Sequence, residues 1–403
     1  MTRLKNRMQT LVSIITFSFI LVPVFFSVSA KEQAEALVQV PFEFNGRVII
    51  PLRVNDSRKL NIILDSGMGH EALGLLHSEL GEELGLEYVQ TIRVGGAGSG
   101  EPKTANIATG AKISLSEINI HWVTVVVNEE SREESIHTDD GLIGSLIFSS
   151  YVVEIDFDRS LLYLYDPAEF ESEKGWEEIP LIMERNAAFL ETSITLDGKT
   201  QIPVRLLVDL GARHALALSV DPAKKIIPPE NAIENLLGTG VRGDVFGPQG
   251  RIVGLTLGSY IINDVIVGFA DKDSIPLPAS CDGNLGVGTL RRFNIIFDYP
   301  YSRMYLKPNT YHLDPFEVNM AGIAMSDTFE RIKRVSYVVK DSPAFQEGIK
   351  KGDKIIAING RKIERYTYSE LYDMFRQEGK KVKLLIERGL ETLKFKLKLR
   401  RLL

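Results

Sequence analysis

Two aspartates are notable because each ends an apolar run and is followed two residues later by a glycine. Asp65 follows Ile62-Ile63-Leu64 and Asp209 follows Leu207-Val208 in a chain of 403 residues. A strand that ends on a carboxylate, with a tight turn beyond it, presents that carboxylate to the space past the strand. Two carboxylates held ~3 Å apart cannot both ionise easily, so one of them keeps its proton. Such a pair combines a base and an acid, and it could activate a water molecule against a peptide carbonyl with no metal or cofactor.

The two aspartates lie in two copies of one repeated segment. The block 140–148 aligns with 282–290 at an offset of 142 residues, and 153–156 aligns with 295–298 at the same offset. The aspartate motifs 63–70 and 207–214 align at an offset of 144. Blocks that match in one order indicate two copies of a domain, at 37–170 and 185–312, joined by a charged linker at 169–178. A pseudo-two-fold axis between the copies would bring Asp65 to Asp209.

The elements that must position these aspartates are mostly strands. The runs 48–54, 60–64 and 122–127 are short, rich in β-branched residues and bounded by turn residues, as is typical of strands. Helical signals are few, and we expect one helix over 71–86. Each copy is therefore predicted to be a mainly β, barrel-like unit.

Composition excludes several classes of protein and divides the chain. A net charge of −6 gives no electrostatic support to nucleic-acid binding. The single cysteine, Cys281, excludes an internal disulfide framework and a cysteine-rich zinc site. Residues 321–403 carry 20 Lys and Arg against 11 Asp and Glu, whereas residues 31–320 carry 24 against 42. This shift predicts a separate domain at 319–403 and an electrostatic attraction between it and the acidic body.

The first thirty residues are typical of a secretory signal peptide. A basic start with Arg3, Lys5 and Arg7 precedes an apolar run over 11–26, and small residues lead to a cleavage site after Ala30. An uncleaved anchor is the alternative, but a spanning helix needs ~20 residues and this run is shorter. We expect an exported protein, periplasmic or secreted, with no membrane span after cleavage.

The aspartate motifs resemble those of the retropepsin and pepsin-like aspartic proteases, in a single-chain bacterial form. Asp65-Ser66-Gly67 is followed downstream by Leu142-Ile143-Gly144, and the second copy repeats this with Asp209-Leu210-Gly211 and Asn284-Leu285-Gly286. The resemblance implies two tandem β-barrel lobes that form one pseudo-two-fold unit. It also implies an aspartic endopeptidase that acts on polypeptide substrates, with Asp65 and Asp209 as the catalytic pair.

One residue departs from the pattern of the family. In the family, a Thr or Ser after each aspartate hydrogen-bonds across the two lobes and braces the active-site loops. Ser66 can make this bond, but Leu210 cannot, and a lost bond of this kind costs about 1 kcal/mol. Two readings follow: an active endopeptidase with an asymmetric brace, or a degenerate peptide-binding or adaptor protein of the same fold.

Two glycine-rich segments fit the flaps of the same family. Flap 1 (94–100) contains Gly96 and Gly98, and its counterpart in the second copy is flap 2 (238–243). In the family a flap is a mobile hairpin over the substrate, and Gly96 and Gly98 are candidate substrate-binding residues. An ordinary surface hairpin is the alternative, because glycine alone does not separate the two.

Two histidines, His70 and His214, each lie five residues after an aspartate. Residues at this position often line substrate pockets in the family, so both are candidate substrate-binding residues. A structural histidine, hydrogen-bonded near the loop, is the alternative. The spacing of His70-Glu71 and His77 does not place two histidines one helical turn apart, so no metal is expected.

The basic C-terminal segment resembles a bacterial PDZ domain, a β-sandwich with helices. The resemblance rests on Ser342-Pro343-Ala344, on the glycines of 348–353 and on Ile358-Asn359-Gly360, and it covers 319–403. It implies a helix over 368–377, a final strand over 393–399, and binding of an extended peptide or C-terminal ligand by strand addition. Capture of a terminal carboxylate is assigned to the loop residues Gly322, Ile323 and Ala324. Binding of internal peptides, or docking on the acidic body, is the alternative.

Overall fold

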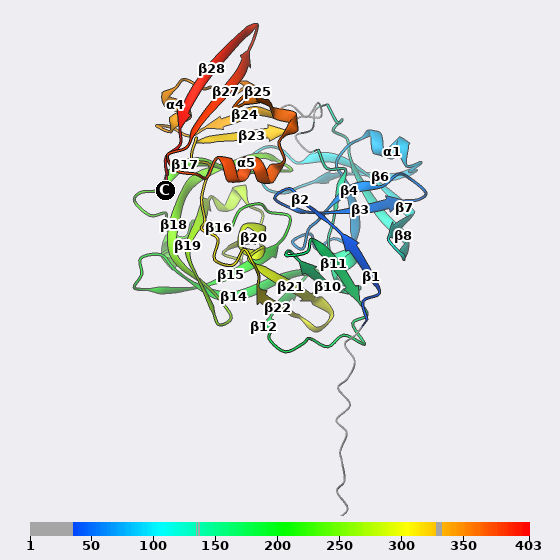
Figure 1. The fold of residues 1–403 in the computed structure, drawn as a ribbon. Helices are drawn as coiled ribbons and strands as arrows, with labels where there is room; N and C mark the ends of the chain where they lie inside the picture. Colours follow the sequence, from blue (N-terminus) through cyan, green and yellow to red (C-terminus); the bar gives the residue numbers. More distant parts are fainter. Residues whose placement is uncertain (1–34, 134, 136–137, 328–332) are drawn as a thin grey trace, which may run out of the picture. The chain divides into compact units, whose positions relative to one another are not determined.

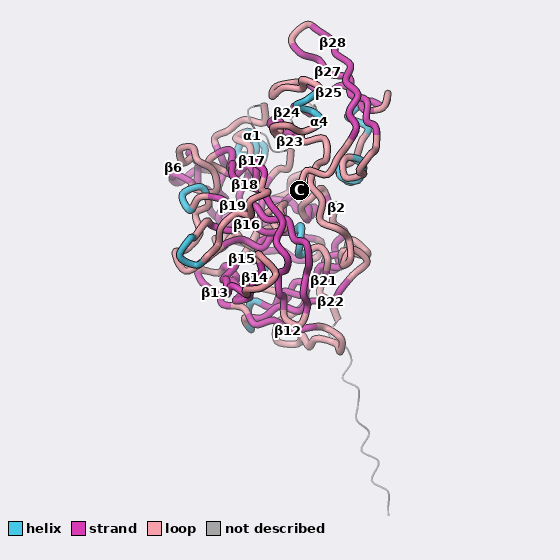
Figure 2. The backbone as a smooth tube through the Cα atoms, turned by 90° about the vertical axis from the view of Figure 1, so that its left-hand side faces the viewer, coloured by secondary structure: helices cyan, strands magenta, loops and turns pink. Residues whose placement is uncertain are grey.

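The computed structural model describes residues 35–133, 135, 138–327 and 333–403, so the predicted signal peptide lies outside the described residues. Strands make up about half of the described chain, and helices are few and short (Figure 2). Within these ranges no helix has both the length and the apolar character needed to cross a bilayer.

Lobe 1 is a closed six-stranded barrel. Its strands pair in the order β3-β4-β9-β5-β8-β7, and β3 pairs again with β7 to close the ring. Figure 1 shows β3, β4, β7 and β8 of this lobe in blue to cyan. Strand β2 extends the sheet beside β3, and β6 forms the flap 1 hairpin with β7. The predicted strands 48–54 and 60–64 match β3 and β4. The strands are β2 (Glu43–Phe44), β3 (Val48–Val54), β4 (Leu60–Leu64), β5 (Ala72–Leu75), β6 (Tyr88–Val94), β7 (Lys103–Leu115), β8 (Ile118–Asn128) and β9 (Gly141–Ile143).

The predicted helix over 71–86 is wrong for most of its length. Residues Ala72–Leu75 form strand β5, which pairs with β8 and β9 inside the barrel, and only Glu79–Glu83 is helical, as α1. Leu73 and Leu75 are fully buried in the barrel core. Barrel closure places this short apolar run between two strands, and this tertiary pairing overrides its weak helical pattern.

Lobe 2 repeats the barrel. The ring runs β14-β15-β20-β16-β19-β18 and closes through a second pairing of β14 with β18. The strands are β13 (Ile182–Glu184), β14 (Ala187–Thr195), β15 (Gln201–Asp209), β16 (Leu216–Ser219), β17 (Ile233–Gly240), β18 (Gly243–Leu257), β19 (Tyr260–Ala270) and β20 (Gly283–Gly286). Two closed barrels confirm the predicted mainly β fold with two barrel lobes.

A six-stranded sheet, in the order β1-β11-β10-β21-β22-β12, joins the two lobes. Its central pair sets Glu154 of β10 opposite Ile296 of β21 in antiparallel register, and these positions are 142 residues apart, which is the repeat offset. The pseudo-two-fold axis therefore passes between them. The linker 169–178 connects β11 to β12, and its last two residues begin β12. The strands are β1 (Val38–Pro41), β10 (Val152–Asp156), β11 (Leu161–Tyr165), β12 (Glu177–Pro180), β21 (Phe293–Asp298) and β22 (Arg303–Pro308).

The C-terminal domain has its own sheet and its own hydrophobic core. Strand β23 lies at one edge of the order β23-β24-β25-β27-β28, and β26 pairs with β25. Helix α5 begins with a capping box between Thr367 and Glu370, which satisfies its first N–H groups. The elements are β23 (Ile323–Asp327), β24 (Lys333–Val338), α4 (Pro343–Gln346), β25 (Lys354–Ile358), β26 (Arg361–Lys362), α5 (Tyr368–Met374), β27 (Lys381–Arg388) and β28 (Glu391–Lys398).

The remaining helices are single turns between strands. Those of the lobes are α2 (Ser145–Phe148), α3 (Val287–Leu290), η1 (Pro222–Lys224), η2 (Lys272–Ser274) and η3 (Tyr299–Tyr301), and the C-terminal domain has η4 (Ile363–Arg365). Helices α2 and α3 directly follow β9 and β20, so they occupy the same place in the two copies.

Candidate active site

Each aspartate motif is placed by a pair of parallel strands in the middle of its barrel. In lobe 1, β4 pairs with β9, and the Asp65 N–H donates to the Ile143 carbonyl at 2.8 Å. In lobe 2, β15 pairs with β20, and Asp209 lies opposite Gly286. The repeated apolar-apolar-glycine motif thus forms the strand beside each aspartate.

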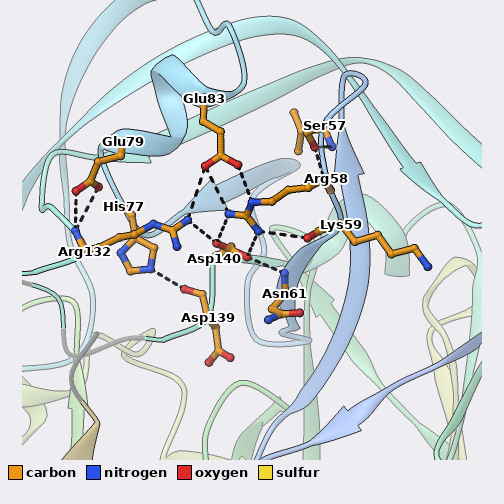
Figure 3. Close-up of polar contacts among 11 residues, drawn as sticks. Ser57, Arg58, Lys59, Asn61, His77, Glu79, Glu83, Arg132, Asp139 and Asp140 are labelled. Carbon is orange, nitrogen blue, oxygen red and sulfur yellow. Dashed lines mark hydrogen bonds and ion pairs between the residues drawn. The ribbon is translucent and has the colours of Figure 1, made fainter. Parts of the chain in front are cut away.

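The aspartate of each Asp-Gly block, Asp140 and Asp282, holds these strand pairs together. Asp140 accepts the Asn61 N–H at 2.9 Å and is also bonded by Arg58 and Arg132, as Figure 3 shows. In lobe 2, Asp282 accepts the Arg205 N–H at 3.0 Å. The two aspartates fix the start of each parallel pair, so their role in the repeat is structural.

The structure brings Asp65 and Asp209 together. Their carboxyl groups are close enough for their charges to interact, and each lies against the glycine of the opposite motif. A Cβ atom at Gly67 would lie 2.8 Å from Asp209 Cγ, and one at Gly211 would lie 2.5 Å from Asp65 Cγ. Each motif requires glycine because the opposite carboxyl group occupies the space of a side chain.

The environment favours a single proton shared by the pair. Burial and the neighbouring charge of Asp209 raise the pKa of Asp65 well above its usual range. The Gly67 N–H, which donates to Asp65 Oδ1 at 2.9 Å, lowers this pKa but does not outweigh them. Asp209 Oδ1 accepts the Ala212 N–H at 3.0 Å. An acid and a carboxylate in direct contact can move protons between a water molecule and a carbonyl group.

Ser66 makes the predicted brace across the lobes. The buried Ser66 hydroxyl donates to the Val208 carbonyl at 2.8 Å and accepts the Leu210 N–H at 2.9 Å. Leu210 is fully buried in the shared core and contributes packing instead of a hydroxyl. Tyr299 supplies a further bond, because its hydroxyl donates to the Ser66 carbonyl at 3.1 Å. The lobe 1 loop is therefore bonded by lobe 2 through a tyrosine that the motif alone does not reveal.

A polar chain runs from Asp209 to His214. The Asn284 amide donates to Asp209 Oδ2 at 2.6 Å, and its Oδ1 lies 3.3 Å from His214 Nε2. Burial lowers the pKa of His214, and the charge of Asp209 raises it by less. The net lowering of the pKa favours the neutral imidazole. His214 is thus hydrogen-bonded near the loop, as one of its two readings has it, and its contact with a substrate stays a prediction. His70 is exposed and lies outside this chain.

Arg47, on the β2–β3 turn, is a partly buried cation beside the pair. Its Nε donates to the Gly211 carbonyl at 2.9 Å, and its Nη1 lies 3.9 Å from Asp139. Burial and the nearby Arg213 lower the pKa of Arg47 to about 10. Arg47 therefore remains charged at neutral pH and ties lobe 1 to the Asp209 loop.

The two flaps contact each other. The Arg242 N–H donates to the Ala97 carbonyl at 2.9 Å, and Arg242 Nε donates to the Gly96 carbonyl at 2.8 Å. Gly98 has a φ of +123°, and a Cβ atom there would lie 2.4 Å from the Arg242 backbone. The glycines of flap 1 thus allow a close approach of the second hairpin.

At the predicted carboxylate loop of the PDZ-like segment, two backbone N–H groups already have a partner within the loop. The Ala321 and Gly322 N–H groups donate to Asn319, so neither is available for a ligand carboxylate. Ile323 and Ala324 begin strand β23, which pairs with β24 and otherwise forms the edge of its sheet among the described strands. Of the three assigned residues, Gly322 has its N–H bonded in this way, and carboxylate capture by the loop stays a prediction. The edge strand suits peptide addition.

The predicted attraction between the basic domain and the acidic body is seen in one ion pair, between Arg401 and Glu317, whereas the contacts of helix α5 are of another kind. Arginines of the lobe 2 side meet aromatic rings: Arg213 lies over the Tyr368 ring at 5.8 Å, and Arg291 over the Tyr372 ring at 5.2 Å. Both tyrosines belong to α5. The contact is thus local cation–π packing, and it places α5 next to a residue four positions after Asp209.

Sequence reasoning missed Asn284, Tyr299 and Arg47. Asn284 carried a signal, because it stands where the first copy has the apolar Leu142. Tyr299 and Arg47 carried none, since their partners lie in the other lobe. Cys281 is buried, and burial raises the pKa of its thiol, as suits a structural residue.

Two family models match parts of the chain. Residues 50–146 match the family model described as aspartyl protease, and residues 334–388 match that described as PDZ domain. No curated protein matches the chain. Among solved structures, the chain is similar to the aspartic proteinase from Irpex lacteus, with 12% identity and a TM-score of 0.42, over 69% of this chain and 98% of that one. With its two closed barrels, the chain combines an aspartyl protease-like domain with a C-terminal PDZ domain.

Proposed function

We propose that the protein is an aspartic endopeptidase that uses Asp65 and Asp209. The observation that supports this most directly is the contact of the two carboxyl groups on loops that Ser66 braces across the lobes. The ionised aspartate takes a proton from water as the water oxygen bonds to the peptide carbonyl carbon, and the protonated aspartate gives its proton to the carbonyl oxygen. A proton then passes to the amide nitrogen and the C–N bond breaks, which releases an acid and an amine.

Cleavage of a denatured protein by the purified chain, between about pH 4 and pH 7, tests this proposal. We expect pepstatin to inhibit, and Asp65→Asn or Asp209→Asn to slow cleavage about 10²- to 10⁴-fold. Cleavage that survives Asp65→Asn would rule out the aspartate pair.

A peptide-binding protein without catalysis is the second candidate, and Leu210 is the observation that favours it. Leu210 lacks the hydroxyl that would complete the brace. This candidate predicts that the wild type binds peptides at every pH tested and cleaves none of them.

We propose that the PDZ domain presents peptides to this site by adding them beside β23. The position of α5, which contacts Arg213 near Asp209, supports a role close to the reaction. Because Asn319 occupies the Ala321 and Gly322 N–H groups, a peptide with an amidated C-terminus should bind as tightly as one with a free carboxylate. Fluorescence anisotropy with the two peptides measures this, and a strong preference for the free carboxylate would contradict the assignment.

We also propose export, on the basis of the signal-peptide pattern of residues 1–30. N-terminal sequencing of the protein recovered outside the cytoplasm should begin at Lys31. Retention of the first thirty residues would instead support an anchor.

A further inference from the structure

The two halves of the candidate site differ at one paired position. In lobe 2, Asn284 lies on β20 beside Leu207 of β15, and in lobe 1 the corresponding Leu142 lies on β9 beside Ile63 of β4. The Asn284 amide reaches Asp209 Oδ2 at 2.6 Å, whereas a leucine side chain has no hydrogen to donate to Asp65. The carboxyl pair is therefore surrounded asymmetrically although the fold is repeated.

The contacts fix the orientation of the Asn284 amide. The reverse orientation would place its oxygen 2.6 Å from Asp209 Oδ2, which sets two acceptors against each other when Asp209 is ionised. With the amide nitrogen toward Asp209, Oδ1 faces His214 Nε2 at 3.3 Å, so a neutral His214 with its proton on Nε2 completes the chain. His214 is thus a donor that holds the asparagine.

We propose that Asn284, held by His214, is a positioning residue that keeps the charge of the pair on Asp209 and the proton on Asp65. A charged acceptor gains more from an amide donor than a neutral one does, so the chain favours the carboxylate form of Asp209. Asp209 is then the base that takes the proton from water, and Asp65 is the acid. This inference rests on the proposed peptidase function.

Other groups around the pair act on both aspartates. Arg47 is close enough to interact with the charges of Asp65 and Asp209, and the Tyr299 hydroxyl is oriented toward Ser66. Burial and both aspartates raise the pKa of Tyr299, so it remains neutral in the acidic range. The Asn284–His214 chain therefore distinguishes the two aspartates, whereas Arg47 attracts both.

The test compares the pH dependence of kcat/KM for Asn284→Leu, which copies lobe 1, with that of the wild type. In Asn284→Leu, the acidic limb of the kcat/KM profile should move to higher pH by about one to two units. This is the shift expected when an ionised carboxylate loses one charge-assisted hydrogen bond. His214→Ala should move it in the same direction by less. Asn284→Asp, which keeps the shape and removes the donor, should move it at least as far as Asn284→Leu. Asn61→Leu, the same change at an exposed position on β4, is the matched control and should leave the profile in place.

An equal loss of rate at every pH, with the acid limb unmoved in Asn284→Leu and Asn284→Asp, would overturn the proposal. If one of these variants does not fold, the other and His214→Ala decide.

A second readout needs no catalysis. Long-range ¹H–¹⁵N spectra of the six histidines, with His214 identified by its loss in His214→Ala, should show a neutral ring protonated on Nε2 at pH 6. A charged ring, or a proton on Nδ1, would contradict the chain. If the wild type cleaves nothing, the peptidase function and the positioning role both fail. The spectra still decide whether the hydrogen bonds from Asp209 through Asn284 to His214 are formed.

Discussion

Replacement of Ser66 by alanine should loosen the union of the two lobes. The change removes two buried hydrogen bonds, 2.8 and 2.9 Å long, and leaves the Val208 carbonyl and the Leu210 N–H without their partner. Each buried group left unsatisfied costs about 1–3 kcal/mol, so we expect a loss of about 2–5 kcal/mol in the free energy of unfolding. For a cooperative unit of about 280 residues, this corresponds to a fall in melting temperature of about 3–9 °C.

Thermal unfolding followed by calorimetry measures this loss, and Ser145→Ala is the matched control. The Ser145 hydroxyl is also buried, but it has no hydrogen-bond partner in the part of the chain that the structure describes. Its removal takes away a buried hydroxyl that is already unsatisfied, so it should not lower the free energy of unfolding. Ser66→Thr keeps the hydroxyl and should retain most of the stability. The reasoning is refuted if Ser66→Ala and Ser145→Ala melt at the same temperature.

Three further changes test other parts of the structure. Tyr299→Phe removes the bond to the Ser66 carbonyl and should cost about 1 kcal/mol in calorimetry, and no loss would show that this bond is not stabilising. Burial raises the pKa of Asp140, but hydrogen bonds from Arg58 and from a backbone N–H outweigh it and hold the pKa below its usual range. Asp140 therefore stabilises the fold above about pH 4, and this contribution is lost as the pH falls further. The free energy of unfolding in urea should thus change less with pH in Asp140→Asn than in the wild type, and an equal change in both proteins would contradict this. Arg242→Ala frees the Gly96 carbonyl and should speed deuterium uptake across flap 1. Unchanged uptake would show that this contact between the flaps does not hold flap 1 in place.

The sequence allowed prediction of the repeat, the two barrels and the two aspartates, because these depend on local patterns that occur twice. It did not allow prediction of the contacts that complete the site. Tyr299 and Ser66 are 233 positions apart, and their contact exists only after the lobes share a sheet. The absence of a hydroxyl at Leu210 was visible in the motif, but the bond from Tyr299 to the same loop was not.

Asn284 and the helix predicted over 71–86 show what local sequence patterns do not determine. Asn284 stood out as a polar residue at an apolar motif position, yet its direction toward Asp209 depends on how β15 and β20 align. The helix predicted over 71–86 failed because barrel closure, and not local preference, decides the conformation of β5.

The strand pair on the pseudo-two-fold axis determines which halves can associate. Two copies of lobe 1 joined in the same way would set Glu154 opposite a second Glu154, and like charges directly opposed in a sheet are destabilising. Burial already raises the pKa of Glu154, which here accepts a hydrogen bond from Tyr165 at 2.6 Å. The pairing with Ile296 avoids this repulsion. The Glu154 repulsion thus disfavours pairing between two copies of lobe 1. Because the two lobes are different segments of one chain, a residue beside one aspartate can differ from its counterpart beside the other, whereas a symmetric homodimer would carry the same residue in both places.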